Sequence, residues 1–236
     1  MSHNKLKVLC LHGFSQNATI FYKKSGFLRT ALKNFADFEY ISGPVNIQEA
    51  PQSIVPSADQ PIDGKVSETK EFQPLQAWFR HAGTDYLGFD ETLKILRDHI
   101  LKEGPFDGIM GFSQGAMVAS LLSVMIERRH PLVNPNGDLP DFKFAIIISG
   151  FTPRLEPFKT FFDAPVKTPS LHVIGETDTT IEPEWSRIHS NSFLKPDIVL
   201  HPGGHVLPSQ AVYKNQMVSF VKKFSENHFP VSGGKL

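Results

Sequence analysis

The chain has 236 residues, which suits one sizeable α/β domain or at most a tight pair. Its 24 lysines and arginines balance 24 aspartates and glutamates, so the formal net charge is zero and nothing indicates a surface for nucleic acid. The single cysteine, Cys10, cannot form an internal disulfide, which favours a reduced, cytoplasmic setting. No segment approaches the about 20 apolar residues that span a bilayer, and no signal peptide is evident, so we expect no stable membrane association.

Strand-like and helix-like patterns alternate from end to end. The pattern predicts strands over residues 7–11, 38–41, 106–110, 144–148, 171–174 and 198–200. Asn17 can cap a helix whose apolar face extends to Phe35, and Asp90 can cap a second helix that stops at Gly104. A third helix, over residues 116–125, is apolar on every side, and a fourth follows Ser209. The alternation predicts an α/β fold with a mostly parallel sheet of about six strands and helices on both faces.

Two proline-containing stretches interrupt this alternation, at about 43–88 and 151–168, and we expect both to be excursions from one domain over 1–236. Both leave carboxyl ends of strands, the edge where α/β sheets place ligands. We interpret them as pocket walls or a small lid; a mobile surface loop is an alternative for the first. The second stretch carries Phe158, Phe161 and Phe162, which could line a pocket for an acyl group.

The most informative motif is Gly-Phe-Ser-Gln-Gly at residues 111–115, a G-x-S-x-G sequence between a predicted strand and the buried helix. On such a strand-to-helix elbow a serine adopts strained backbone geometry and its hydroxyl stands clear of the sheet. The flanking glycines are needed because a Cβ there would collide with the neighbouring strand and helix. Ser113 is therefore the candidate nucleophile.

A serine hydroxyl needs a base within hydrogen-bond reach, and on this type of sheet the chain order is nucleophile, acid, histidine. Asp178 follows the fifth predicted strand and His205 follows the sixth, so both should share the rim with Ser113. His201 is a rival base, although it lies in or beside a strand. Glu176 and Asp197 are rival acids, and Asp197 precedes its strand, at the opposite end of the sheet.

Two backbone N–H groups should stabilise the oxyanion that forms on the substrate carbonyl. One is expected from Gln114, the residue after the nucleophile, and the other from the loop after the first strand. In that loop we choose Phe14, because Gly13 lets the backbone turn toward the elbow, and we expect His12 to be structural. The sequence contains no H-E-x-x-H motif, no other compact histidine or cysteine pair with the spacing of metal ligands and no P-loop, so we expect neither metal nor cofactor.

Taken together, Leu-His-Gly-Phe-Ser-Gln-Asn at 11–17, Gly-Phe-Ser-Gln-Gly-Ala at 111–116, Asp178 and Pro-Gly-Gly-His at 202–205 resemble the FSH family of serine hydrolases. That family is related to the human ovarian cancer-associated gene 2 product. The resemblance extends over essentially the whole chain, although Gly-Phe-Ser-Gln-Gly also occurs in acyl-protein thioesterases. It implies an α/β-hydrolase fold, the triad Ser113, Asp178 and His205, and esterase activity on short to medium acyl esters.

The sequence thus predicts a carboxylesterase that acts on a small-molecule acyl ester through an acyl-enzyme. An acyl thioesterase or a lysophospholipase is the alternative among enzymes. A binding protein on a hydrolase scaffold is the alternative from another class, although a binding role would need none of the triad. The oligomeric state does not follow from the sequence.

Overall fold

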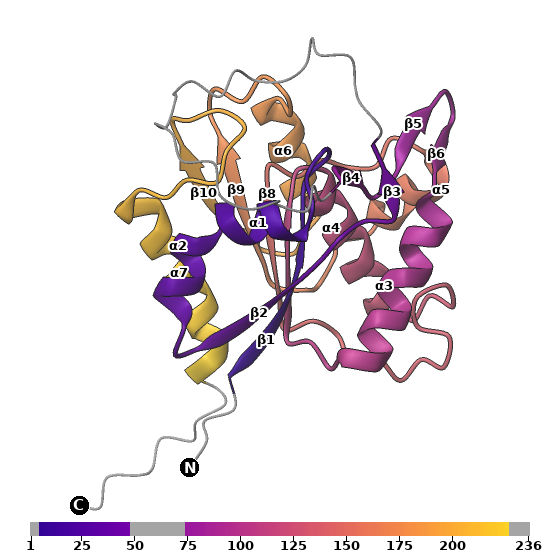
Figure 1. Cartoon of the computed structure of the whole chain (residues 1–236), viewed down its shortest axis with the longest axis horizontal. Coiled ribbons are helices and arrows are strands. Elements are labelled where there is room, and N and C mark those ends of the chain that lie inside the picture. Colours follow the sequence, from indigo (N-terminus) through magenta and orange to yellow (C-terminus); the bar gives the residue numbers. More distant parts are fainter. Residues whose placement is uncertain (1–4, 48–73, 227–236) are drawn as a thin grey trace, which may run out of the picture.

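The computed structural model describes residues 5–47 and 74–226. Its centre is a sheet of six strands, all parallel, in the order β10-β9-β8-β7-β1-β2 (Figure 1). The strands are β1 (Leu6–Leu11), β2 (Ala36–Ile41), β7 (Gly108–Phe112), β8 (Phe144–Ile148), β9 (Ser170–Gly175) and β10 (Asp197–His201). The predicted parallel α/β architecture is therefore confirmed, and every predicted strand is present with its ends shifted by two residues at most.

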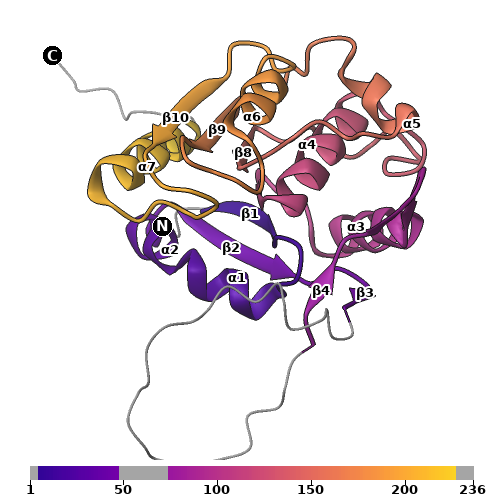
Figure 2. The ribbon, with the colours of Figure 1, turned by 90° about the horizontal axis from the view of Figure 1, so that it is seen from above.

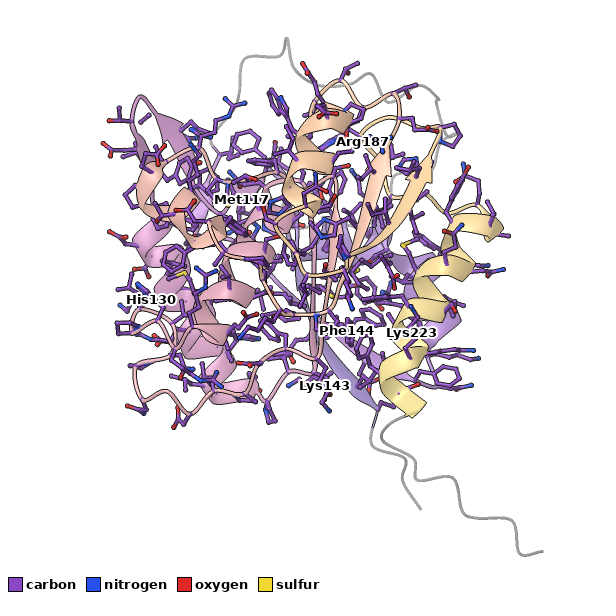
Figure 3. The ribbon with its side chains drawn as sticks, turned by 180° about the vertical axis from the view of Figure 1, so that it is seen from behind. Met117, His130, Lys143, Phe144, Arg187 and Lys223 are labelled. Carbon is purple, nitrogen blue, oxygen red and sulfur yellow. The ribbon has the colours of Figure 1, made fainter. Side chains whose placement is uncertain are left out.

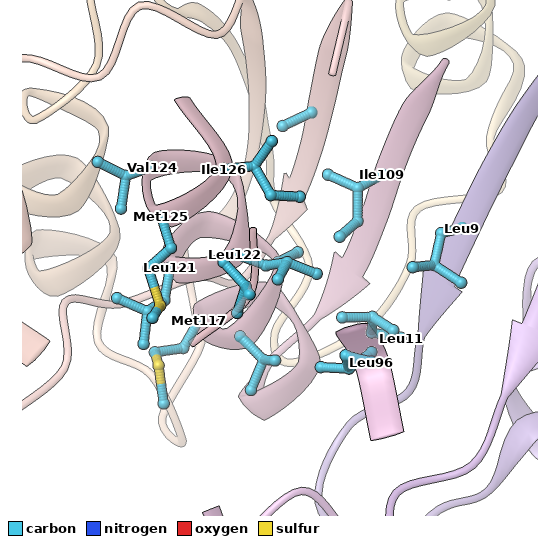
Figure 4. Packing of buried hydrophobic residues seen from close by; sticks show 14 of the residues in the cluster. Leu9, Leu11, Leu96, Ile109, Met117, Leu121, Leu122, Val124, Met125 and Ile126 are labelled. Carbon is cyan, nitrogen blue, oxygen red and sulfur yellow. The ribbon is translucent and has the colours of Figure 1, made fainter. Parts of the chain in front are cut away.

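Helices cover both faces of the sheet (Figure 2). They are α1 (Ala18–Lys24), α2 (Gly26–Leu32), α3 (Phe89–Glu103), α4 (Gln114–Glu127), α5 (Glu156–Lys159), α6 (Pro183–Ser190) and α7 (Ala211–Glu226). Alternate strand residues supply the two cores, since successive side chains point to opposite faces. In β1, Val8 and Cys10 pack with α1, α2 and α7, whereas Leu9 and Leu11 pack with α3 and α4 (Figure 4).

Two helix boundaries differ from the prediction. The helix after Asn17 is broken at Ser25, whose hydroxyl donates to the Phe21 carbonyl and lies 2.6 Å from the Tyr40 hydroxyl. The chain then restarts as α2, so Phe35 lies beyond both helices. Asp90 is not the cap of α3: Gly88 is, in the left-handed conformation that glycine favours, and Asp90 lies in the first turn.

The two excursions contain small elements of their own. In the first, β3 (Val45–Asn46) pairs antiparallel with β4 (Gln76–Ala77), and β5 (Arg80–Ala82) pairs with β6 (Asp85–Leu87). Residues 48–73 of this predicted excursion lie outside the described residues. The second contains α5 and a 3-10 turn, η2 (Thr160–Phe162). None of the helices in the described ranges is long and apolar enough to cross a membrane.

Candidate active site

Ser113 occupies a sharp turn between β7 and α4. Its φ of 54° and ψ of −117° lie in a region that non-glycine residues rarely adopt. The turn is closed by the two glycines of the motif: a Cβ on Gly111 would lie 2.2 Å from the Gly115 carbonyl oxygen, and a Cβ on Gly115 would lie 2.3 Å from the carbonyl oxygens of Leu11 and His12. The strand, the helix and the loop after β1 therefore meet at van der Waals contact around the serine.

Asp178 and His205 lie together at the carboxyl ends of β9 and β10. Asp178 Oδ2 accepts a hydrogen bond from His205 Nδ1 at 2.7 Å. The carboxylate is only 4% exposed, and its other oxygen accepts from the backbone N–H groups of Thr180 and Ile181, each at 2.9 Å. These bonds fix the carboxylate, which can only accept, so the proton of the pair lies on His205 Nδ1. Nε2 is then free to accept a proton.

Packing between the two loops holds this pair at the rim. A Cβ on Gly175 would lie 2.4 Å from the Gly204 carbonyl oxygen, so only glycine permits this approach. Thr177 Oγ1 also donates to the Pro202 carbonyl at 3.0 Å. The His205 ring lies 4.7 Å, centroid to centroid, from the ring of Phe112, the residue before Ser113. The imidazole therefore lies beside the elbow.

The rival residues occupy other surroundings. His201 is buried within β10, where its Nδ1 accepts from the Gly203 N–H at 3.2 Å, and burial lowers its pKa. Asp197 lies at the opposite end of β10 and pairs with Lys223 at 2.7 Å. Glu176 is exposed, and its backbone N–H donates to the His201 carbonyl. None of them takes the place of Asp178 or His205 in the pair.

The loop after β1 forms the other side of the elbow. It presents Phe14, which is 50% exposed, toward solvent. Within the described residues, the backbone N–H groups of Phe14 and Gln114 donate to no protein acceptor. His12 is fully buried, its Nδ1–H donates to the Gly13 carbonyl at 2.7 Å, and its Nε2 accepts from the Gly43 N–H at 2.9 Å. Burial lowers the pKa of His12 to about 4, so the ring is neutral and both nitrogens are occupied.

The side chain of Gln114 is a functional candidate that the sequence did not reveal. Its Oε1 accepts from the Trp78 N–H at 2.9 Å and its Nε2 donates to the Phe79 carbonyl at 2.8 Å. The Trp78 indole N–H in turn donates to the His12 carbonyl at 2.8 Å. A hydrogen-bonded chain thus connects the residue after the nucleophile to the loop that carries Phe14. The sequence offers one hint of this chain, the aromatic pair Trp78-Phe79 within a proline-rich stretch.

The three phenylalanines predicted to line an acyl pocket are dispersed. Phe158 stacks on Tyr86 at 5.9 Å and lines a groove of about 940 Å³ beside the start of α3. Phe161 packs against His130, which follows the C-terminal end of α4 and is labelled in Figure 3. A helix of 14 residues is about 21 Å long, so Phe161 lies well away from the elbow.

Phe162 lies beside α6. It packs against His189, whose Nε2 lies 2.8 Å from Ser120 Oγ in the second turn of α4. The rings of Phe161 and Phe162 therefore pack against the hydrophobic core that contains α4. In the described part of the chain, no group of three or more His, Cys, Asp or Glu side chains could hold a metal ion.

The parallel sheet, the strained serine and the carboxylate–imidazole pair define the α/β-hydrolase class. A model of the family described as "Serine hydrolase (FSH1)" matches residues 1–217, and the chain belongs to this family of serine hydrolases. The zebrafish protein "Esterase OVCA2" is 32% identical over 95% of this chain and 100% of its own length. The chain is accordingly a serine hydrolase.

Two further comparisons bear on length and fold. A Schizosaccharomyces pombe protein named "Dihydrofolate reductase" is 32% identical over 92% of this chain, which spans only 47% of that protein. Among solved structures, maize acyl-protein thioesterase 2 superposes with a TM-score of 0.62, at 20% identity, over 96% of this chain and 95% of its own. At that identity the likeness shows the fold alone.

Proposed function

We propose that the chain is a carboxylesterase that cleaves short- to medium-chain acyl esters through a covalent acyl-enzyme on Ser113. The observation that carries this proposal is the Asp178–His205 hydrogen bond of 2.7 Å, at the same sheet rim as a serine with a φ of 54°. A buried carboxylate, an imidazole with a fixed tautomer and a strained serine are the parts that acyl transfer requires.

The proton steps follow from the tautomer. His205 Nε2 takes the Ser113 proton as Oγ attacks the ester carbonyl, and the imidazolium is stabilised by Asp178 through Nδ1–H. The tetrahedral intermediate collapses, the ester C–O bond breaks, and His205 returns the proton to the leaving alcohol oxygen. Water then attacks the acyl-enzyme by the same route and releases the carboxylic acid and Ser113.

In this mechanism the developing oxyanion is bound by the backbone N–H groups of Gln114 and Phe14. Both are free of protein acceptors within the described residues, and the first belongs to the N-terminal turn of α4, whose dipole favours negative charge. Loss of one such donor typically lowers turnover by about 10²–10³. We also retain as predictions a single domain over 1–236, a cytoplasmic location and the absence of stable membrane association.

The test is a panel of p-nitrophenyl esters from acetate to decanoate, with the matched acyl thioesters beside them. We expect turnover of the esters to peak at a short or medium chain and to vanish in Ser113→Ala. Ser149→Ala is the matched control, since Ser149 is also a buried serine with positive φ at a strand end, and it should keep wild-type turnover. Hydrolysis that persists in Ser113→Ala would overturn the proposal, and faster thioester cleavage would favour the thioesterase alternative.

A further inference from the structure

A small cavity lies directly beside His205. Its volume is about 190 Å³, and it is lined by Lys24, Phe112, His205, Val206 and Leu207. Three of these side chains are apolar, one is the proposed base and one is a lysine. The cavity is therefore an apolar recess that adjoins the proposed chemistry and carries a single cationic group on its wall.

Lys24 has no counter-ion among the described residues. Across residues 5–47 and 74–226, its ammonium makes neither an ion pair nor a hydrogen bond to another residue. The side chain is exposed, yet enough protein surrounds it that burial lowers its pKa. A partly desolvated ammonium without a partner gains more from an incoming anion than a fully hydrated one does.

The helix position alone does not account for this arrangement. Lys23 and Lys24 both lie in the last turn of α1, where a cation interacts favourably with the helix dipole. Lys23 is exposed and lines no part of the cavity, although it has the same charge and the same helix end. Lys24 is thus distinguished from its neighbour by the recess that it faces.

The chemistry indicates which part of a substrate enters the recess. In the proposed mechanism His205 returns a proton to the leaving alcohol oxygen, so the alcohol part of the ester must lie against His205. An alcohol seated in the recess would have Phe112, Val206 and Leu207 against its carbon body, because these side chains line the cavity. A group at its distal end would then face the Lys24 ammonium.

We propose that the site prefers esters whose alcohol part carries an anionic oxygen group, a carboxylate or a phosphate, which Lys24 binds. The inference rests on the proposed function, since it takes the role of His205 from it. It deepens that function by assigning a charge to the leaving group, while the acyl part remains the short or medium chain discussed above. The acyl group itself makes no contact that the inference requires.

The test uses three butanoate esters that differ only in the alcohol: 4-(butanoyloxy)benzoate, 4-(butanoyloxy)phenyl phosphate and the neutral methyl 4-(butanoyloxy)benzoate. We expect Lys24→Met to lower kcat/KM about tenfold for an anionic ester, the effect of losing one hydrogen bond to a charged group, and to leave the neutral ester unchanged. Lys24→Arg should retain the preference. The ester that loses more identifies carboxylate or phosphate as the preferred group.

Lys23→Met is the matched control, and it should change none of the three values. Equal losses for charged and neutral esters, or the same loss in Lys23→Met, would overturn the inference. If the neutral ester is hydrolysed in a Ser113-dependent manner but the anionic esters show no Lys24 dependence, only the inference fails. If no ester shows Ser113-dependent hydrolysis, the proposed function itself fails.

Discussion

The two sides of the Ser113 elbow are built differently. On the side of the loop after β1, the chain from Gln114 through Trp78 to His12 consists of buried hydrogen bonds between backbone and side chains. On the other side, Asp178 is locked by three hydrogen bonds, but the imidazole that it holds borders an open cavity. The first side is held throughout by buried hydrogen bonds. On the second side the hydrogen bonds fix Asp178, and the His205 ring keeps one side open to the cavity.

This difference agrees with what each side has to do in the proposed mechanism. Oxyanion donors must be in place before charge develops, so they benefit from a buried, pre-organised frame. The base must exchange protons with the serine, the leaving group and water, so it needs access. Substitutions on the His205 side should therefore lower activity and leave the fold intact. Substitutions on the Gln114 side should lower both activity and stability.

The largest effect is expected on the His205 side. We expect His205→Ala to lower kcat for p-nitrophenyl butanoate by roughly 10⁴-fold or more, because Ser113 then has no base. Its thermal unfolding should stay near that of the wild type, since the ring borders a cavity. A variant that keeps substantial turnover would show that another residue, with His201 the first candidate, is the base.

Asp178→Asn should lower kcat by about 10³–10⁴ through the tautomer of His205. The amide oxygen is held by the N–H groups of Thr180 and Ile181, as the carboxylate is now, so its NH₂ group faces His205 Nδ1. Nδ1 must then accept, Nε2 carries the proton, and the ring cannot act as base. Steady-state kinetics test this, and a loss below tenfold would contradict the account of the pair.

On the cross-linked side, Gln114→Leu should affect stability and activity together. The variant leaves the Trp78 N–H and the Phe79 carbonyl buried without partners, at a cost of about 1–3 kcal/mol each in unfolding free energy. We also expect kcat to fall about tenfold as the Phe14 loop loses its support, well short of the about 10²–10³ for losing a donor outright. Gln76→Leu is the control and should be nearly neutral, because the half-buried Gln76 amide makes only one long contact, 3.5 Å to Asn46 Oδ1. Unchanged stability in Gln114→Leu would contradict the role of the amide.

The last prediction concerns the pH dependence of stability, which involves the buried imidazoles and not the proposed catalytic groups. The folded-state pKa of His12, about 4, lies below the ordinary value of 6.5, so below pH about 6.5 the unfolded chain binds a proton that the folded chain excludes. Stability therefore falls as the pH is lowered from about 6.5 to about 4, by about 1.4 kcal/mol per pH unit for each such group. Burial likewise lowers the pKa of His189, to about 3, and that of His172.

Urea unfolding between pH 7 and pH 5 measures this slope. His12→Gln should be less stable than the wild type at neutral pH, because the hydrogen bond from the Gly43 N–H is disturbed. The slope of its unfolding free energy against pH should also be smaller, by about 1.4 kcal/mol per pH unit, because one titrating histidine is lost. A wild-type protein whose unfolding free energy does not change over this range would contradict the neutral, buried state of these rings.

Much of the frame was predictable because it depends on periodicity and local chemistry. The central strands β7 and β8 are apolar runs, and the G-x-S-x-G motif itself explains why glycines flank the elbow. The pairing of Asp178 with His205 agrees with their positions after β9 and β10, because parallel strands bring their carboxyl ends to one edge.

The remainder depends on long-range contacts that no local pattern encodes. Ser25, where the helix breaks, contacts the hydroxyl of Tyr40 on β2, a partner 15 residues away in sequence. The helix α6 escaped prediction because its short sequence is mostly polar. Composition alone does not reveal that Phe161 and Phe162 pack against the hydrophobic core, and their role as pocket walls stays a prediction. The Gln114–Trp78–His12 chain joins three segments that are far apart in sequence.

The central claim is that Ser113 is the nucleophile, and covalent labelling tests it most directly. The wild-type protein should react with a fluorophosphonate probe, and peptide mass spectrometry should place the adduct on Ser113. Ser113→Ala should remain unlabelled, while Ser149→Ala should label like the wild type. An unlabelled wild-type protein, or an adduct that persists in Ser113→Ala, would contradict the account.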